Sequence, residues 1–502
     1  MATDTFLKST LVDLTWYDAA NWTQGLPVAG VVAHINGKRS VTLRLAPLGG
    51  ASAKAGELSI SAAAVGLFGG QLLIGGVSGG GTQPFDLELK QSATLTIAST
   101  ATLSGAGTMA MGLDGSATKM RVNGTVFEDY ALVASGQLAI LGSGHWITGS
   151  SGIAVGGANG ASLLIANGGV VDEGRKGLSQ YADSLAIGEG AGSGAVRVTG
   201  LGSLAAFTEV YVGVNGEARL TIANGGVVQD DVGVVALNGD GYVLVTGQGS
   251  RWDNFGGLTV GEVYPTDSTL TITNGGQVDW GVGGLGLHDT MKLDGSATLG
   301  GQYIYDGGEI LALAGHGDVR MSQDIVIASN WLYNFADVAF FYAQKGVTLS
   351  LTGQITGGDL SDLRVGVSDV AVTNAGNHFG HTEIYGGVLE VWATGALGAG
   401  AVNFIGGTKT HAELAIEGGT HLDNLIVGFA ATDRIDLGGF QFTDTIAKSW
   451  TENALGTAGT LALDNGVGAF TLQFAGARTA SDFQLTANTV AGSTLTLAHG
   501  AV

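Results

Sequence analysis

Acidic side chains are the residues of this chain whose types and spacing offer the most scope for chemistry. Two adjacent pairs stand out, Asp230-Asp231 and Asp172-Glu173. Glycoside cleavage needs carboxylates that converge on one bond, but neighbouring residues on a β-strand point to opposite faces. We therefore interpret both pairs as solvated turn acids, and the sequence predicts a protein without catalytic residues.

Four further aspartates are candidates for holding Ca²⁺, which takes carboxylate and carbonyl oxygens as ligands. They are Asp114, Asp240, Asp433 and Asp436. No zinc motif, nucleophile elbow or cofactor fingerprint occurs beside them. Ca²⁺ is thus the ion that the sequence leaves open, and no cofactor is certain.

Aromatic residues gather in two segments and are candidates for assembly interfaces, because exposed apolar groups mark contact sites. The first segment carries Trp16 and Trp22, and the alternative there is a cap that covers the first coil. The second segment has a larger core as its alternative; its residues are Trp331, Tyr333, Phe335, Phe340 and Tyr342.

A repeated phrase shows which elements must position these residues. Leu-Thr-Ile-Ala-Asn-Gly-Gly and close variants place the tripeptide at Asn167, Asn224 and Asn274. An alternating apolar run followed by a turn with positive φ predicts a strand, a turn and a second strand. Repetition of such a unit indicates a solenoid, in which each coil buries its apolar face on the next.

A second phrase, Val-Thr-Gly-x-Gly-Ser, begins at Val198 and at Val245 and alternates with the first. Together they predict coils of about 24–25 residues and a full repeat of two coils, about 50 residues. Strands stacked in this way lie ~4.8 Å apart. The fold class predicted is therefore all-β, a parallel β-solenoid.

The amino-acid composition argues against several classes of function. The 502 residues include 88 Gly, 4 Pro and no Cys, and the formal net charge is −22. This charge argues against binding to a nucleic-acid backbone, and the apolar residues form no run long enough for a transmembrane segment. The chain also lacks disulfide chemistry.

The repeats resemble the passenger coils of bacterial autotransporter-type adhesins, which are right-handed β-helices. Residues 374–400, with Asn374, Asn377 and Gly386-Gly387, are similar to the autotransporter-associated β-strand repeat. The resemblance implies a right-handed parallel β-helix with an N-terminal cap, exposed at a cell surface.

The C-terminal part resembles the module that closes large bacterial proteins exported by type I secretion. It carries Ile426-Val-Gly-Phe429, Asp433-Arg-Ile-Asp436 and a final Thr494-Leu-Thr-Leu. The start of the sequence lacks the charged and apolar regions of a secretory signal peptide. The resemblance therefore implies an extracellular or cell-surface location reached by type I secretion without an N-terminal signal.

These observations divide the chain into a cap at 1–45, coils at 46–318, an aromatic segment with further coils at 319–417, and a C-terminal β module for secretion or assembly at 418–502. The predicted function is that of a non-enzymatic structural protein of the bacterial surface or biofilm matrix. It would assemble with itself into filaments, ribbons or a surface layer through end-to-end and lateral contacts. Two alternatives remain: a monomeric adhesin or stalk that binds glycan or a host surface, with surface polysaccharide as its partner, and a polysaccharide-degrading β-helix enzyme.

Overall fold

The computed structural model describes residues 2–5, 13–15, 22–23, 31–36, 40–45, 53–55, 57–61, 64–74, 87–104, 107–172, 183–261, 267–306, 308–327, 338–366, 368–405, 411–488 and 492–498. The chain divides into two compact units, Met1–Gly283 and Gly284–Val502. This division falls inside the segment 46–318 that the repeats predict as one run of coils. Each unit is built from β-strands, and the second also holds a short 3₁₀ helix, η3 (Ala480–Asp482).

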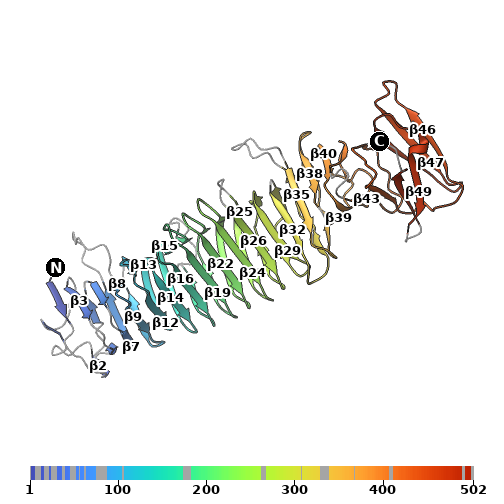
Figure 1. The fold of residues 1–502 in the computed structure, drawn as a ribbon. Coiled ribbons are helices and arrows are strands. Elements are labelled where there is room, and N and C mark those ends of the chain that lie inside the picture. Colours follow the sequence, from blue (N-terminus) through green and yellow to red (C-terminus); the bar gives the residue numbers. More distant parts are fainter. Residues whose placement is uncertain are drawn as a thin grey trace. The chain divides into compact units, whose positions relative to one another are not determined.

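The first unit is a parallel β-solenoid, as the repeats predict, and its coils lie side by side in the blue to green part of Figure 1. Its strands form three parallel ladders, each of which takes one strand or part of a strand from successive coils. Ladder A contains β1 (Ala2–Thr5), β3 (Val31–Asn36), β6 (Glu57–Ser61), β8 (Leu87–Lys90), β11 (Thr108–Met111), β13 (Thr125–Val133), β15 (His145–Val155), β18 (Ser184–Ile187), β21 (Glu209–Val212), β23 (Val227–Val235) and β25 (Arg251–Val260).

The other two ladders of the first unit share its long strands. Ladder B contains β2 (Asp13–Thr15), β4 (Ser40–Leu45), β7 (Ala64–Ile74), β9 (Thr94–Ile97), β12 (Thr118–Val122), β14 (Gly136–Leu141), β16 (Ala161–Ala166), β19 (Gly194–Thr199), β22 (Ala218–Ala223), β24 (Gly241–Thr246) and β26 (Ser268–Thr273). Ladder C contains β5 (Ala53–Ala55), β10 (Ala101–Ser104), β17 (Val170–Asp172), β20 (Leu204–Ala206), β27 (Gln277–Asp279) and parts of β7, β13, β15, β23 and β25.

The core of this unit is a set of apolar columns that run from coil to coil. Along ladder B the side chains alternate between interior and surface, as a period of two requires. The register places like residues directly above one another, and one such column is Leu138, Leu163, Val196, Leu220, Val243 and Leu270, each at most 2% exposed. Each buried aliphatic side chain contributes roughly 1.5–3 kcal/mol of transfer free energy, so the stack holds through its continuous interior.

Two kinds of turn alternate after the strands of ladder B. The asparagines of the Asn-Gly-Gly turns, Asn167, Asn224 and Asn274, have φ values of 55°, 52° and 54°. The prediction of a turn with positive φ is confirmed, and asparagine is among the residues that enter this region most readily. The intervening coils use the Thr-Gly-x-Gly-Ser turn, whose two glycines also have positive φ.

The serine of one turn satisfies the backbone of the other. The hydroxyl of Ser203, which is fully buried, accepts a hydrogen bond from the amide of Gly168 in the preceding coil at 3.1 Å and donates to the carbonyl of Thr199 at 2.8 Å. The same arrangement recurs two coils later at Ser250. A buried amide without a partner is costly, so the Asn-Gly-Gly turns at Asn167 and Asn224 each gain from a serine turn stacked upon them.

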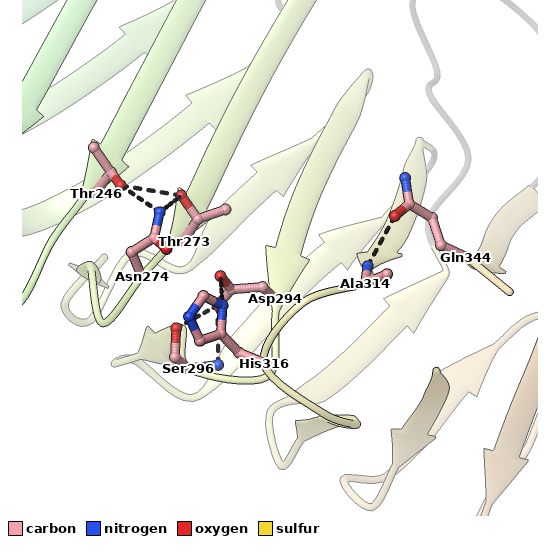
Figure 2. A network of polar contacts seen from close by, with 8 residues as sticks. All are labelled: Thr246, Thr273, Asn274, Asp294, Ser296, Ala314, His316 and Gln344. Carbon is pink, nitrogen blue, oxygen red and sulfur yellow. Dashed lines mark hydrogen bonds and ion pairs between the residues drawn. The ribbon is translucent and has the colours of Figure 1, made fainter. Parts of the chain in front are cut away.

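Two of the asparagines, Asn224 and Asn274, make the return contact with the coil that comes before them. The side-chain amide of Asn224 donates to the hydroxyl of Thr199 at 3.2 Å, and that of Asn274 donates to Thr246 at 2.9 Å (Figure 2). Each turn type therefore bonds to the other type on its neighbours. This interlock is the physical reason why the sequence repeats over two coils rather than one.

The second unit has the same architecture, with parallel ladders of its own. Its C-terminal strands then pair mainly antiparallel. One ladder contains β28 (Leu285–Leu287), β31 (Tyr303–Asp306), β34 (Asp324–Ile327) and β37 (Ile355–Gly357). A second contains β29 (Thr290–Asp294), β32 (Glu309–Leu313), β35 (Val338–Ala343), β38 (Asp362–Val365), β40 (His381–Ile384), β42 (Val402–Phe404) and β44 (Leu425–Val427). A third contains β33 (Val319–Met321), β36 (Thr348–Leu351), β39 (Ser368–Val372), β41 (Gly387–Val391), β43 (Ala412–Ile416) and β45 (Arg434–Leu437), and β30 (Thr298–Leu299) lies between β29 and β31 in sequence.

The C-terminal strands pair mainly antiparallel and extend two of these ladders (Figure 1). Strand β44 pairs in parallel with β48 (Ala469–Ala475), which continues antiparallel into β47 (Ala458–Asp464) and β46 (Ala447–Glu452). Strand β45 pairs antiparallel with β50 (Ser493–Leu497), which pairs with β49 (Phe483–Ala487). The parallel coils thus extend to Leu437, beyond the predicted start of the C-terminal module at 418. No helix in the described parts of the chain has the length and hydropathy of a membrane span.

The interlock can be tested at Ser250. We expect Ser250→Ala to leave the amide of Gly225 and the carbonyl of Thr246 without a partner, and to destabilise this part of the solenoid by about 1–3 kcal/mol. Hydrogen exchange of the Gly225 amide measures the effect locally, and its protection should fall. Ser143→Ala is the matched control, because the Ser143 hydroxyl donates to a carbonyl at an exposed position. Equal protection in both variants would contradict a role for the buried hydroxyl.

Candidate functional site

The predicted interface residues fall into three groups in the structure. Trp16, Trp331, Tyr333 and Phe335 lie outside the described residues. Trp22 is 2% exposed, so its side chain is buried. The remaining two residues, Phe340 and Tyr342, lie on β35.

Phe340 and Tyr342 form the described part of the aromatic segment and share the outer face of β35. Both are half-buried, whereas Phe341 between them is fully buried. Their rings stack with centroids 6.1 Å apart and planes 6° apart. Both residues belong to strand β35, in which interior and outer side chains alternate from Ala339 to Ala343.

A charged cluster lies beside these rings and centres on Arg364 of β38. Its guanidinium lies 5.2 Å from the ring centroid of Phe340, within the range of a cation–π contact. It pairs with Asp362 at 3.3 Å and with Glu383 of β40 at 2.6 Å, and the hydroxyl of Tyr385 donates to Glu383 at 3.0 Å. Burial raises the pKa of Asp362, and the charge of Glu383 raises it further.

Sequence reasoning missed this cluster because its members lie on different coils. The register pairs Phe340 with Arg364 and Arg364 with Glu383. The sequence signal for such a cluster is a set of charged and aromatic residues spaced by one coil, since residues one coil apart become neighbours on the surface. The groups here can bind and orient a partner through charge and ring contacts.

A second polar network joins the three residue types of a serine hydrolase in the wrong order. Asp294, 4% exposed in its side chain, pairs with His316 at 2.9 Å and accepts a hydrogen bond from the hydroxyl of Ser296 (Figure 2). In a hydrolase the histidine contacts the serine and removes its proton, whereas here the aspartate lies between them. The carboxylate also accepts from the Ser296 amide, so it caps a turn and links it to the next coil.

The interpretation of Asp230-Asp231 as solvated turn acids is wrong for Asp230. Its side chain is 1% exposed and points into the solenoid, where Trp252 donates to it at 3.0 Å and Asn254 at 2.7 Å. Asp231 is exposed, so the two carboxylates do point to opposite sides. Removal from water raises the pKa of Asp230 to about 7, and hydrogen bonds from Trp252 and Asn254 oppose the rise.

Of the other predicted acidic pair, Asp172-Glu173, the structure describes Asp172. Asp172 is half-buried, and one of its carboxylate oxygens lies 3.0 Å from Nε2 of His145. Glu173 lies outside the described residues. Asp172 therefore contacts the imidazole of His145 in a neighbouring coil, and this contact links the two coils.

The four aspartates considered for Ca²⁺ each bind groups of the chain itself. Asp114 accepts from the amides of Gln91 and Ser116, and Asp240 accepts from the amide of Asp267. These are turn-capping contacts between coils or within one turn. They hold the carboxylates at well-defined positions on the surface.

Asp433 and Asp436 lie in the C-terminal part of the second unit. Asp433 is 1% exposed and accepts from the amide of Ala430, and burial raises its pKa. Asp436 accepts from the side-chain amide of Asn488 at 2.7 Å. Across the described residues, no group of three or more His, Cys, Asp or Glu side chains is placed to hold a metal ion, so a Ca²⁺ site at these aspartates stays a prediction.

Comparison of the chain with protein-family models, with curated proteins and with solved structures finds no match. The functional assignment therefore rests on the geometry of the fold and on the surfaces described above.

The buried carboxylate of Asp230 predicts a pH-dependent stability. Its pKa is raised in the folded state, so ionisation there costs free energy, and stability falls as pH rises from about 4 through 7. We expect Asp230→Asn to stabilise the protein at pH 8, by roughly 1.4 kcal/mol per unit of pKa difference, and to stabilise it less at pH 5, where wild type has lost only part of this free energy. Its new amide can donate to Oδ1 of Asn254, a buried atom without a hydrogen-bond partner.

Thermal unfolding of wild type and variant at both pH values measures this difference. Asp231→Asn is the matched control: it removes the same charge from an exposed neighbour, whose charge raises the pKa of Asp230 less than burial does, and it should shift the pH profile far less than Asp230→Asn. A variant that is destabilised equally at pH 5 and pH 8 would contradict the assigned ionisation.

Proposed function

We propose that this chain is a non-enzymatic structural protein of a bacterial cell surface or extracellular matrix, and that it associates with copies of itself. The observation that carries the proposal is the way in which coils bind coils. Each coil is completed by backbone pairing, apolar columns and turn contacts from its neighbours. A fold that grows by adding like units presents, at its ends, the same kind of surface that holds it together.

The terminal strands of the described ladders support this mechanism. Among the described strands, β1 pairs with β3 only and β2 with β4 only. At the other end of the chain β46 pairs with β47 only and β49 with β50 only. Strands paired on one side can offer N–H and C=O groups as templates for pairing with another chain. In β1 the N–H and C=O of Thr5 are already bonded to Thr23.

The kind of contact between copies determines the form of the assembly. Contacts between unlike surfaces that do not close give open filaments or layers, whereas contacts between like surfaces give closed dimers. The cluster of Phe340, Tyr342 and Arg364 is the proposed lateral contact, because it combines stacked rings with charges on one outer face. Ribbons or a surface layer would then arise from end and side contacts together.

The proposed location is outside the cell. The resemblance of the C-terminal part to modules of type I secretion supports this export route, and the absence of cysteine in the sequence suits an oxidising surrounding without disulfides. A formal net charge of −22 favours solubility during export. The same charge makes divalent cations natural partners, and we propose Ca²⁺ as a factor that promotes assembly.

A monomeric adhesin is the second candidate, and one feature favours it. Tyr303 and Tyr305 of β31 lie on one face, 39% and 41% exposed. Aromatic rings presented in this way offer apolar faces and hydroxyl groups to a ligand. Surface polysaccharide is the partner proposed for this alternative.

Electron microscopy of negatively stained protein, with and without millimolar Ca²⁺, tests the main proposal. We expect regular filaments, ribbons or sheets at high protein concentration, and more of them when Ca²⁺ screens the acidic surface. Sedimentation over a range of concentrations quantifies the same association. A strictly monomeric chain across salt and Ca²⁺ conditions would overturn the proposal, and binding of polysaccharide by that monomer, lost in Tyr303→Ala, would establish the alternative.

A further inference from the structure

Strand β46 is an open edge in the C-terminal module of the second unit. Among the described strands it pairs with β47 alone. All its residues are exposed except Trp450, which is half-buried. Native proteins protect such edges with charged side chains, prolines or bulges. Strand β46, Ala-Lys-Ser-Trp-Thr-Glu, carries two charged residues but no proline, and its pairing with β47 has no register shift.

The hydrogen bonds of the hairpin show which residues of β46 have free backbone groups. In an antiparallel pair every second residue directs its N–H and C=O toward the partner strand. The amide of Asn453 donates to the carbonyl of Ala458 at 2.8 Å, so Asn453 is one of the residues that bond to the β47 side. The alternation then directs the N–H and C=O groups of Lys448, Trp450 and Glu452 away from β47.

The side chains of the same three residues lie on one face of the strand. Trp450 stacks on Phe483 of β49 with ring centroids 5.9 Å apart, and the ammonium of Lys448 donates to the carbonyl of Phe483. Since side chains of residues two apart share a face, Glu452 belongs to this face too. The ring contact fixes Trp450 at the centre of the edge, with a positive charge on one side and a negative charge on the other.

We infer that β46 pairs antiparallel with β46 of a second copy of this chain, with Trp450 of one copy opposite Trp450 of the other at a two-fold axis. In this register Lys448 of each copy lies opposite Glu452 of the other. The free N–H and C=O groups of Lys448, Trp450 and Glu452 then meet one another across the axis. The inference rests on the proposed self-association and names one contact for it.

The charges of the edge favour this partner and this register. The strand is complementary to its own reverse, which is what an isologous contact requires. Two opposite-charge pairs form, and each such cross-strand pair contributes about 0.2–1 kcal/mol. A shift of two residues in either direction keeps the backbone pattern but sets Lys448 or Glu452 opposite Trp450, and both ion pairs are lost.

Charge reversal tests the contact, because the partner residues are different residues of the same strand. Lys448→Glu places two pairs of acids opposite each other in the dimer, and Glu452→Lys places two pairs of bases. We expect each single variant to self-associate about tenfold more weakly than wild type. A mixture of the two single variants restores opposite charges at both pairs, and so does the double variant Lys448→Glu/Glu452→Lys.

Sedimentation velocity over a concentration series measures the association of each sample. Asp423→Lys is the matched control: Asp423 is exposed in the same unit, and its reversal changes the net charge as Glu452→Lys does. Far-ultraviolet circular dichroism and thermal unfolding confirm that each variant is folded. Glu452→Lys remains informative if loss of the Lys448 contact with Phe483 affects the module, because no ion pair of Glu452 occurs among the described residues.

Recovery in the mixture and in the double variant, with loss in both single variants, is the expected result. Single variants that associate as wild type does, or a mixture no stronger than its parts, would overturn the β46 contact while the proposed function stands. A wild-type chain that stays monomeric at every concentration would overturn the proposed function, and the contact with it.

Discussion

The structure depends on one constraint: no coil of this chain can satisfy its own backbone or bury its own apolar face. In the described coils, strands pair with strands of adjacent coils, and the interior residues form columns that cross from coil to coil. The turns obey the same constraint. Ser250 bonds to the amide of Gly225 in the coil before it, and Asn274 bonds to Thr246 in the same direction. The alternation of two turn sequences is therefore a consequence of how turns stack, and the repeat has a length of two coils for that reason.

Polar groups inside such a stack must find partners in the coils that enclose them. Asp230 does so through Trp252 and Asn254 of the next coil, at the expense of a strongly raised pKa. Asp294 does so through Ser296 and His316 and connects two turns. These networks use residue types that elsewhere perform catalysis, but here each carboxylate is directed at the backbone or at a neighbouring coil. Their role follows from geometry, and residue type alone does not reveal it.

The ends of a stack are where the same forces remain available for other molecules. At the C-terminal end of the second unit the ladders change from parallel to antiparallel pairing, and strands β48 and β50 cover the last coil. Because β48, β47 and β46 continue the ladder of β44, the strand with an open edge is β46, which carries Lys448 and Glu452. The proposed dimer contact uses this open edge, and it supports the proposed self-association. The edge of β46 is complementary to its own reverse, so this part of the second unit can associate with a second copy in a defined register.

The sequence by itself determined the class of fold and the Asn-Gly-Gly turns. Alternating Leu, Ile and Val residues specify strands with one buried face, and Asn-Gly pairs specify turns with positive φ, because both signals act within a few residues of chain. Only the tertiary structure decided which residues meet. Asp230 and Trp252, or Arg364 and Glu383, lie a coil apart, and their contact depends on the register with which coils stack. Turns and insertions of unequal length set that register, so local patterns could not place Asp230 inside, could not assemble the Arg364 cluster, and could not show that β46 lies at an edge.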